Sequence, residues 1–158
     1  MLKLNWIEFF LRTLPELLII VWGVHIISKR PINIPKYILS SIVLSILTFF
    51  VRWLPIYFGM HMIINILLIT SIMILIDIPI IKSIYSTLLM FFVLTLGELL
   101  NIIILNLLDK NVKAILINPL IKFIYFLPSL IFLLLFVIIM NYLQKMNKRE
   151  KDISKLKR

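Results

Sequence analysis

Residues 51–65 read VRWLPIYFGMHMIIN, and this stretch decides where the apolar chain folds back on itself. Arg52 lies near the end of one apolar run, and a proline and a glycine then interrupt any helix. His61 and Asn65 open the next apolar run one helical turn apart. The pattern predicts a tight turn between two helices, at which the polar side chains need partners because lipid cannot solvate them.

The composition of the whole chain is that of a membrane protein. Of its 158 residues, 62% are hydrophobic and only 15% are charged, whereas soluble domains are about half apolar and a quarter charged. Several apolar runs approach the roughly 20 residues that a helix needs to cross a hydrocarbon core of about 30 Å. The sequence therefore predicts an all-α, polytopic transmembrane helix bundle in the cell membrane.

The apolar runs predict five spans, separated by prolines and charged residues. Pro15 is expected to kink the first span, and Asp77 and Pro79 separate a short third span from the fourth. The alternative is a six-span chain, in which residues 114–127 form a re-entrant segment or an additional crossing. The division expected is a membrane domain at residues 1–144 and a basic tail at residues 145–158. The approximate spans are residues 6–27, 37–57, 61–76, 83–108 and 120–144.

The distribution of basic residues predicts the orientation, because cytoplasmic loops are enriched in lysine and arginine. Residues 28–36 carry three basic side chains, and residues 145–158 carry seven basic and two acidic ones, half of the net charge of +10. Five spans place both segments on one side, so the C-terminus is expected in the cytoplasm and the N-terminus outside. Residues 109–122 disagree, because they carry three lysines on the outer side. A basic end beside a span indicates topology, and no nucleic-acid partner is expected.

Polar side chains recur at helical spacing inside the spans, so each set shares one helix face. At about 1.5 Å per residue, the charged members lie at a similar depth, in the outer half of the bilayer. The three cations Arg12, Arg52 and Lys122 would balance the three anions Glu8, Glu16 and Glu98. Of these, Arg52 is expected to pair with Glu98. The sets are Glu8, Arg12 and Glu16; Ser41, Ser45, Thr48 and Arg52; His61 and Asn65; Thr95, Glu98 and Asn101; and Lys122, Tyr125 and Ser129.

This polar layer predicts a ligand-binding pocket that opens to the outside. Two other interpretations stay open: the charges neutralise one another as contacts between helices, or Glu98 and His61 titrate along an ion or proton path. Charges in the membrane cost roughly 2.5 to 3.5 kcal/mol each, so pairing is required in every case. His25 is expected to face the membrane interface without a chemical role. The candidate ligand-binding residues are Arg12, Glu16, Arg52, His61, Asn65, Glu98, Asn101, Lys122 and Tyr125.

Catalysis is not expected. The chain has no cysteine, which excludes disulfides, thiolate metal sites and cysteine nucleophiles. It also lacks a paired aspartate set, a Ser/His pair, a HExxH helix and a glycine-rich phosphate loop. No metal site and no cofactor are therefore expected. Because GxxxG motifs are absent too, the helices are expected to pack through serine, threonine and shape.

Three short motifs resemble the membrane sensor region of a known family. They are RTLPE at residues 12–16, RxxPxxxGxH at residues 52–61 and GE at residues 97–98. Together they resemble the sensor region of multi-span, GHKL-type sensor histidine kinases of Gram-positive, spore-forming bacteria, over roughly residues 5–145. The resemblance implies that the membrane part senses an external or lipid-embedded cue and that the fifth span passes movement to a cytoplasmic helix.

The chain departs from that family at its C-terminal end. Residues 1–158 contain neither a phosphoacceptor histidine nor an ATP-binding domain, so the resemblance does not imply kinase activity. The expected function is a sensor-like or accessory membrane protein without catalytic activity, which binds a small ligand, peptide or lipid. The alternatives are a small transport component (a substrate-binding subunit or an ion-coupled carrier) and a structural assembly protein. The expected partners are the lipid bilayer, a separately encoded kinase or transporter subunit, and a second copy of the chain.

Overall fold

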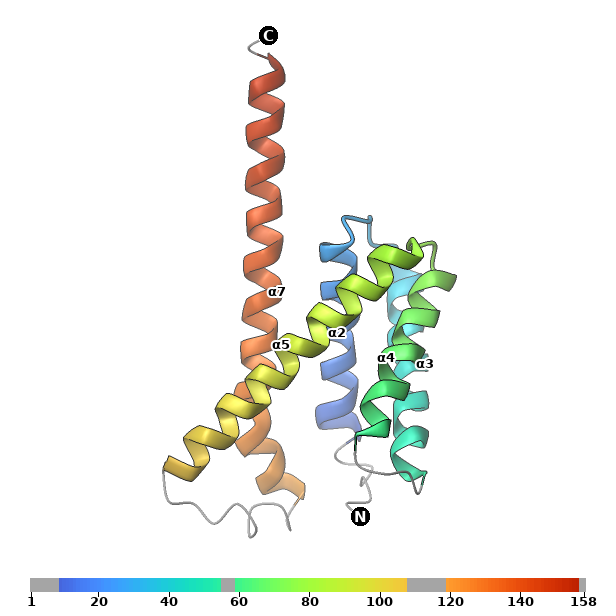
Figure 1. The fold of residues 1–158 in the computed structure, drawn as a ribbon, viewed down its shortest axis with the longest axis vertical. Helices are drawn as coiled ribbons and strands as arrows, with labels where there is room; N and C mark the ends of the chain where they lie inside the picture. Colours follow the sequence, from blue (N-terminus) through green and yellow to red (C-terminus); the bar gives the residue numbers. More distant parts are fainter. Residues whose placement is uncertain (1–8, 55–58, 108–118, 157–158) are drawn as a thin grey trace.

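The computed structural model describes residues 9–54, 59–107 and 119–156, and every regular element in these ranges is a helix (Figure 1). The all-helical prediction is confirmed. Residues 55–58 and 108–118, which include Pro55 of the predicted turn, lie outside the described ranges. The elements are η1 (Phe9–Thr13), α2 (Leu14–Ile27), α3 (Ile34–Trp53), α4 (Met60–Leu75), α5 (Ile80–Leu107) and α7 (Pro119–Leu156).

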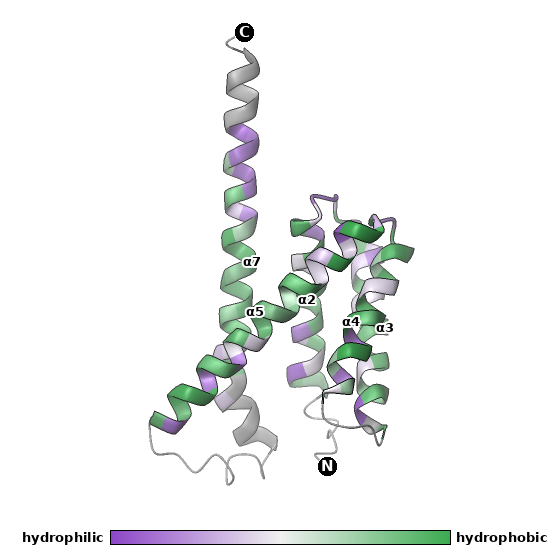
Figure 2. Cartoon of the chain, viewed as in Figure 1, coloured by the Kyte–Doolittle hydropathy of each residue, from purple (hydrophilic) through white to green (hydrophobic). Residues whose placement is uncertain are grey.

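Four helices of the described chain are long and apolar enough to cross a membrane: Phe9–Ile27, Ile34–Arg52, Ile80–Leu107 and Leu127–Arg149. Most of the length of these helices has the colour of hydrophobic residues in Figure 2. The helix α4 is apolar but has only 16 residues, about 24 Å at 1.5 Å per residue. It corresponds to the short third span of the prediction. The described part of the alternative crossing, which was expected at residues 114–127, forms the first turns of α7.

Prolines set most of the helix boundaries. A π-helical turn, η1, leads into α2 directly before Pro15, which has no N–H to donate to the preceding turn. The break at residues 76–79 is confirmed, since α4 ends at Leu75 and α5 begins after Pro79. The second span was expected to begin at residue 37, whereas α3 begins at Ile34. Proline is tolerated in the first helical turn, where its missing N–H needs no partner.

The helix α2 lies at the centre of the bundle and packs against α3, α5 and α7 (Figure 1). The short α4 lies between α3 and α5. The long α5 is inclined, so that it crosses α2 and its C-terminal half leans towards α7. The helix α7 continues beyond the bundle through Leu156, so residues 145–156 extend the last span as the same helix.

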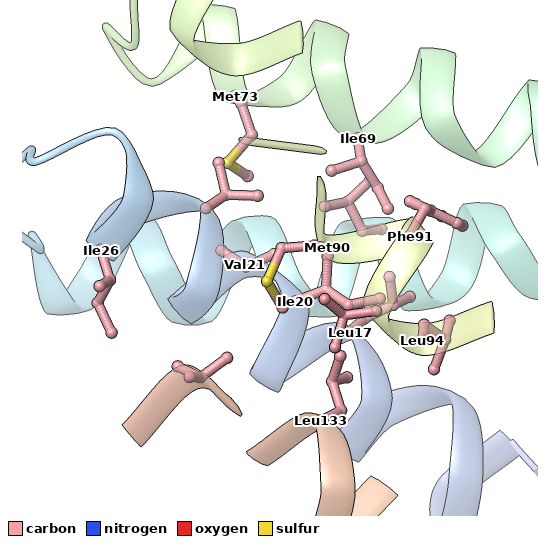
Figure 3. Close-up of a cluster of buried hydrophobic side chains, with 14 of the residues drawn as sticks. Leu17, Ile20, Val21, Ile26, Ile69, Met73, Met90, Phe91, Leu94 and Leu133 are labelled. Atoms are coloured by element: carbon pink, nitrogen blue, oxygen red, sulfur yellow. The ribbon is translucent and has the colours of Figure 1, made fainter. Parts of the chain in front are cut away.

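The core forms where α2, α3, α4, α5 and α7 meet (Figure 3). The exposed large side chains of the outer faces are also apolar, as in a protein that is surrounded by lipid. Many side chains of the core are fully buried, among them Ile20, Met73 and Met90. The other labelled members in Figure 3 are Leu17, Val21, Ile26, Ile69, Phe91, Leu94 and Leu133.

Small residues hold the helices close together. The Ser28 and Ser86 hydroxyls lie 3.2 Å apart between the end of α2 and α5, which confirms packing through serine. Glycine also contributes, although the absence of GxxxG motifs had suggested otherwise. A Cβ atom at Gly23 would overlap the Met90 sulfur and would lie 3.1 Å from a Val137 methyl carbon. Gly23 therefore admits side chains of α5 and α7 against the backbone of α2.

We expect Gly23→Val to lower the free energy of unfolding by about 1–3 kcal/mol, because the added methyl groups overlap Met90. Thermal unfolding in detergent micelles measures this loss. Adding Met90→Ala is expected to restore part of the stability, since it removes the obstructing sulfur. If the second substitution restores nothing, Met90 is not what limits the size of residue 23.

Candidate functional site

A cavity of about 340 Å³ lies among α2, α3, α4 and α5, in the half of the bundle where α2 and α4 begin. We call it the N-terminal cavity. Figure 2 shows hydrophilic segments on α2, α3 and α4 in this half of the molecule. Its rim includes the exposed residues Gly59, Met62 and Thr95. Its polar lining comprises Thr13, Glu16, Thr48, Arg52, His61, Asn65, Thr95 and Glu98.

Two arginines and two glutamates meet at this cavity. The Arg12 guanidinium donates through Nη2 to Oε1 of Glu98, and its Nε lies 3.8 Å from Oε2 of Glu16. Arg52 lies close enough to attract the Glu16 carboxylate electrostatically. The expectation that Arg52 pairs with Glu98 is therefore wrong. The inclined α5 crosses α2 and brings Glu98 to Arg12, while Arg52 approaches Glu16 from the end of α3.

Arg52 differs from Arg12 in its contacts. Within the described residues, no hydrogen bond or ion pair engages the Arg52 guanidinium, which is only partly buried. The Glu16 side chain that attracts it is almost completely buried, at 7% exposure. Arg12 thus contacts two carboxylates, whereas the N–H donors of Arg52 are available to bind a molecule in the cavity.

Buried polar atoms without a protein partner gather at the N-terminal cavity. Five such side-chain atoms occur in the described part of the chain, and four of them belong to residues that line this cavity. Leaving one buried donor or acceptor unsatisfied costs about 1–3 kcal/mol, so four in one place require a polar occupant, either water or a ligand. The four atoms are Thr13 Oγ1, Thr48 Oγ1, His61 Nδ1 and Asn65 Oδ1.

The local sequence explains how α4 contributes to the cavity. Gly59 precedes α4 with φ of 101°, a left-handed conformation that is strained for other residues. A Cβ atom there would meet nothing within 4 Å. Glycine is therefore required by the backbone conformation and not by a lack of space for a side chain. The carbonyl of Gly59 accepts from the N–H of Met62 at 3.1 Å, which starts the helix. His61 and Asn65 consequently occupy its first two turns.

Two predicted site residues lie elsewhere. Asn101 is buried between α5 and α7, where its Nδ2 donates to the carbonyl oxygen of Tyr125 at 2.7 Å. Neither Asn101 nor Tyr125 lines the N-terminal cavity, because the last turns of α5 lean away from α3 and α4 towards α7. Their bond lies one turn before Pro128, where the missing N–H weakens the hydrogen bonds of the helix.

Two further predicted charges lie outside the described part of the chain. Lys122 belongs to α7, but its side chain is outside what the structure describes, and Glu8 lies outside the described ranges. Of the three cations and three anions that were predicted to balance, the structure therefore describes the side chains of two cations and two anions.

Sequence reasoning missed three polar cavity residues and misjudged a histidine. Thr13, Thr48 and Thr95 were not site candidates, although each lies three or four residues from a charged residue and so shares its helix face. His25, expected at the membrane interface, is only 2% exposed. Its Nδ1 donates to the Val21 carbonyl at 2.9 Å, and its ring packs edge-on against Tyr37.

The described residues contain no group of three His, Asp or Glu side chains that could hold a metal ion. Comparisons with protein-family models, curated proteins and solved structures found no match to the chain.

Proposed function

We propose that this protein is a five-span, sensor-like or accessory membrane protein without catalytic activity, whose N-terminal cavity binds a small zwitterionic molecule such as an amino acid. One observation carries the proposal. Four buried polar atoms without protein partners and the unengaged Arg52 guanidinium line one cavity of about 340 Å³.

The chemistry of the lining argues for the class of ligand. A guanidinium is suited to bind a carboxylate through paired hydrogen bonds, and the Thr13 and Thr48 hydroxyls can donate to the same group. The Asn65 carbonyl oxygen and the Glu16 carboxylate can accept from an ammonium group. Because the charges around the cavity already balance, a zwitterion leaves no net charge buried. The volume is near the lower end of the range for small-molecule sites, which favours a molecule of amino-acid size.

The distribution of charge supports a cavity that opens to the outside. The turn at residues 28–33 and the projecting part of α7 lie at the opposite end of the molecule from the cavity (Figures 1 and 2). Both carry lysine and arginine, as cytoplasmic ends do. In this orientation the N-terminus is outside and the C-terminus is in the cytoplasm.

The likeness to kinase sensor regions agrees with this assignment. Most of the polar residues in its three motifs lie around the same cavity. They come from η1, α2, α3, α5 and the start of α4. Leu133 and Val137 of α7 are buried against the bundle, and α7 then continues as one helix to Leu156. A ligand that repacks the bundle could therefore move α7 and act on a separately encoded kinase. The cavity residues in the motifs are Thr13, Glu16, Arg52, Gly59, His61 and Glu98.

The test is ligand-induced stabilisation of the purified protein, with the individual amino acids as probes. At a hundred times its dissociation constant, a binding amino acid is expected to stabilise the protein by about 2.7 kcal/mol and to raise Tm by several degrees. Arg52→Gln and Thr48→Val are expected to abolish the shift. Lys36→Gln, which changes an exposed lysine far from the cavity, is expected to keep it. If no amino acid raises Tm, or if Arg52→Gln responds like the wild type, this ligand class is wrong.

Two carboxylates at one cavity also favour an ion-coupled carrier as a second candidate. Glu16 and Glu98 both contact Arg12, and carboxylates inside a membrane often belong to proton relays in pumps and transporters. Concentrative uptake of an amino acid into proteoliposomes, lost in Glu98→Gln, would establish transport and exclude a protein that only senses.

A further inference from the structure

A second cavity, of about 540 Å³, lies at the opposite end of the bundle, between the turn at residues 28–33 and α7. We call it the basic cavity. Lys29 and Arg30 line it from the turn, and Lys145 and Lys148 line it from α7. No acidic side chain lines it among the described residues, so four positive charges surround a single space.

One face of α7 forms a wall of this cavity. Asn141, Gln144, Lys145 and Lys148 are spaced by three and four residues, so they share the side of α7 that faces the end of α2. The Gln144 amide donates through Nε2 to the Ile26 carbonyl at 2.8 Å. This bond fixes α7 against α2, so the basic side chains of the two elements are held on opposite sides of the cavity.

No ion pair among the described residues engages the four cations around the basic cavity. Asp77, in the turn between α4 and α5, lines a smaller neighbouring cavity together with Arg30 but forms its ion pair with Lys36, at 3.0 Å. The four cations therefore repel one another. Cations clustered beside a low-dielectric bundle raise the local concentration of anions.

We infer that the basic cavity binds the phosphate group of an anionic membrane lipid. Basic pockets between spans on the cytoplasmic side are suited to phosphate head groups, because lysine and arginine supply both charge and donors. The cavity lies where the apolar part of α7 gives way to charged residues, which is the expected level of the head groups (Figure 2). Ile26, Pro31 and Ile32 add apolar walls that suit the glycerol and upper acyl region of a lipid.

This site is separate from the N-terminal cavity and does not depend on its ligand. A phosphate held between the turn and α7 would join α2 to the helix that projects into the cytoplasm. The position of α7 would then depend on the content of anionic lipid in the membrane.

The test compares the protein in nanodiscs of phosphatidylcholine and in nanodiscs that also contain phosphatidylglycerol. The wild type is expected to have a higher Tm with phosphatidylglycerol and to retain that lipid in native mass spectra. Removing two cations with Lys29→Gln/Lys148→Gln is expected to weaken phosphatidylglycerol binding about thirtyfold, since each cation near an anionic surface contributes a factor of about five. Arg149→Gln is the matched control, because Arg149 lies beside Lys148 on α7 but does not line the cavity.

A glycine variant separates charge from folding. Lys29 has φ of 53°, a left-handed conformation in which glycine is favoured. The Lys29→Gly variant should therefore keep the turn and be at least as stable as the wild type in phosphatidylcholine. The increase in Tm that phosphatidylglycerol causes should be smaller than in the wild type.

Two results would overturn the proposal. In one, phosphatidylglycerol stabilises the Lys29→Gln/Lys148→Gln variant as much as the wild type, or Arg149→Gln weakens binding equally. In the other, inorganic phosphate added to phosphatidylcholine nanodiscs stabilises the wild type as much as phosphatidylglycerol does. The site would then bind phosphate from solution, and the lipid would not be its ligand.

Discussion

Arg12→Ala and Glu98→Ala are each expected to lower the free energy of unfolding by roughly 2 to 4 kcal/mol. Arg12→Ala removes the cation that pairs with the Glu98 carboxylate, and Glu98→Ala removes the carboxylate to which Arg12 donates. The expected loss is below that of a fully buried pair, because the Glu98 side chain is 34% exposed. Arg12→Ala is expected to be the more harmful change, since Arg12 also lies 3.8 Å from the buried Glu16 carboxylate. Unfolding by heat or by a denaturing detergent, followed in mild micelles, measures both losses.

A double-mutant cycle tests the pairing itself. The double variant Arg12→Ala/Glu98→Ala is expected to be more stable than the sum of the single losses predicts, by about 0.5 to 3 kcal/mol. The same cycle for Arg52 and Glu98 is the control and is expected to show weaker coupling, because no ion pair joins these side chains. Additive losses for Arg12 and Glu98, or stronger coupling for Arg52 and Glu98, would contradict the observed arrangement.

The two arginines therefore have different parts in the same cluster. Arg12 joins η1 to α5 and has a structural role whatever the cavity binds. Arg52 offers its donors to the cavity, so its replacement is expected to affect ligand binding more than stability. A purely structural role for the whole charged layer would instead make both arginines matter equally for stability.

The break around Asp77 and the gathering of charged side chains at one end of the bundle could be predicted from the sequence, because both depend on local chemistry. Proline and a change from apolar to polar residues mark the break around Asp77, and helical spacing places Arg12 and Glu16 on one face. These features follow from the backbone and from the cost of charge in lipid. They do not require knowledge of how the helices cross.

The pairing across helices could not be predicted, because it depends on the inclination of α5. That inclination brings Glu98 to Arg12 and takes Asn101 away from α3 and α4, and residue spacing within one helix contains no information about it. Gly23 is a similar case. Its role is visible only when Met90 and Val137 approach from two other helices. The unpartnered hydroxyls of the cavity likewise become evident only when the surrounding side chains are in place.

Access to the N-terminal cavity from outside can be tested directly, because the chain has no cysteine of its own. We expect Thr48→Cys in sealed right-side-out vesicles to react with a membrane-impermeant thiol reagent at least about tenfold faster than Ser45→Cys. Only thiolates react quickly, and a thiolate needs water and benefits from the nearby Arg52. Ser45 lies one turn away on the same helix, is fully buried, and donates to the Ser41 carbonyl at 2.7 Å.

The pattern of labelling separates the interpretations of the charged layer. Fast reaction of Thr48→Cys from outside, slowed by an amino acid that raises Tm, indicates a wet binding site in the proposed orientation. Reaction only from the cytoplasmic side would invert the topology, because the cavity and the basic end must face opposite sides. Equal and slow reaction at both positions would mean that water does not reach the cavity. The charged residues would then serve only to hold the helices together, since an ammonium or carboxylate group cannot enter a site that water cannot reach.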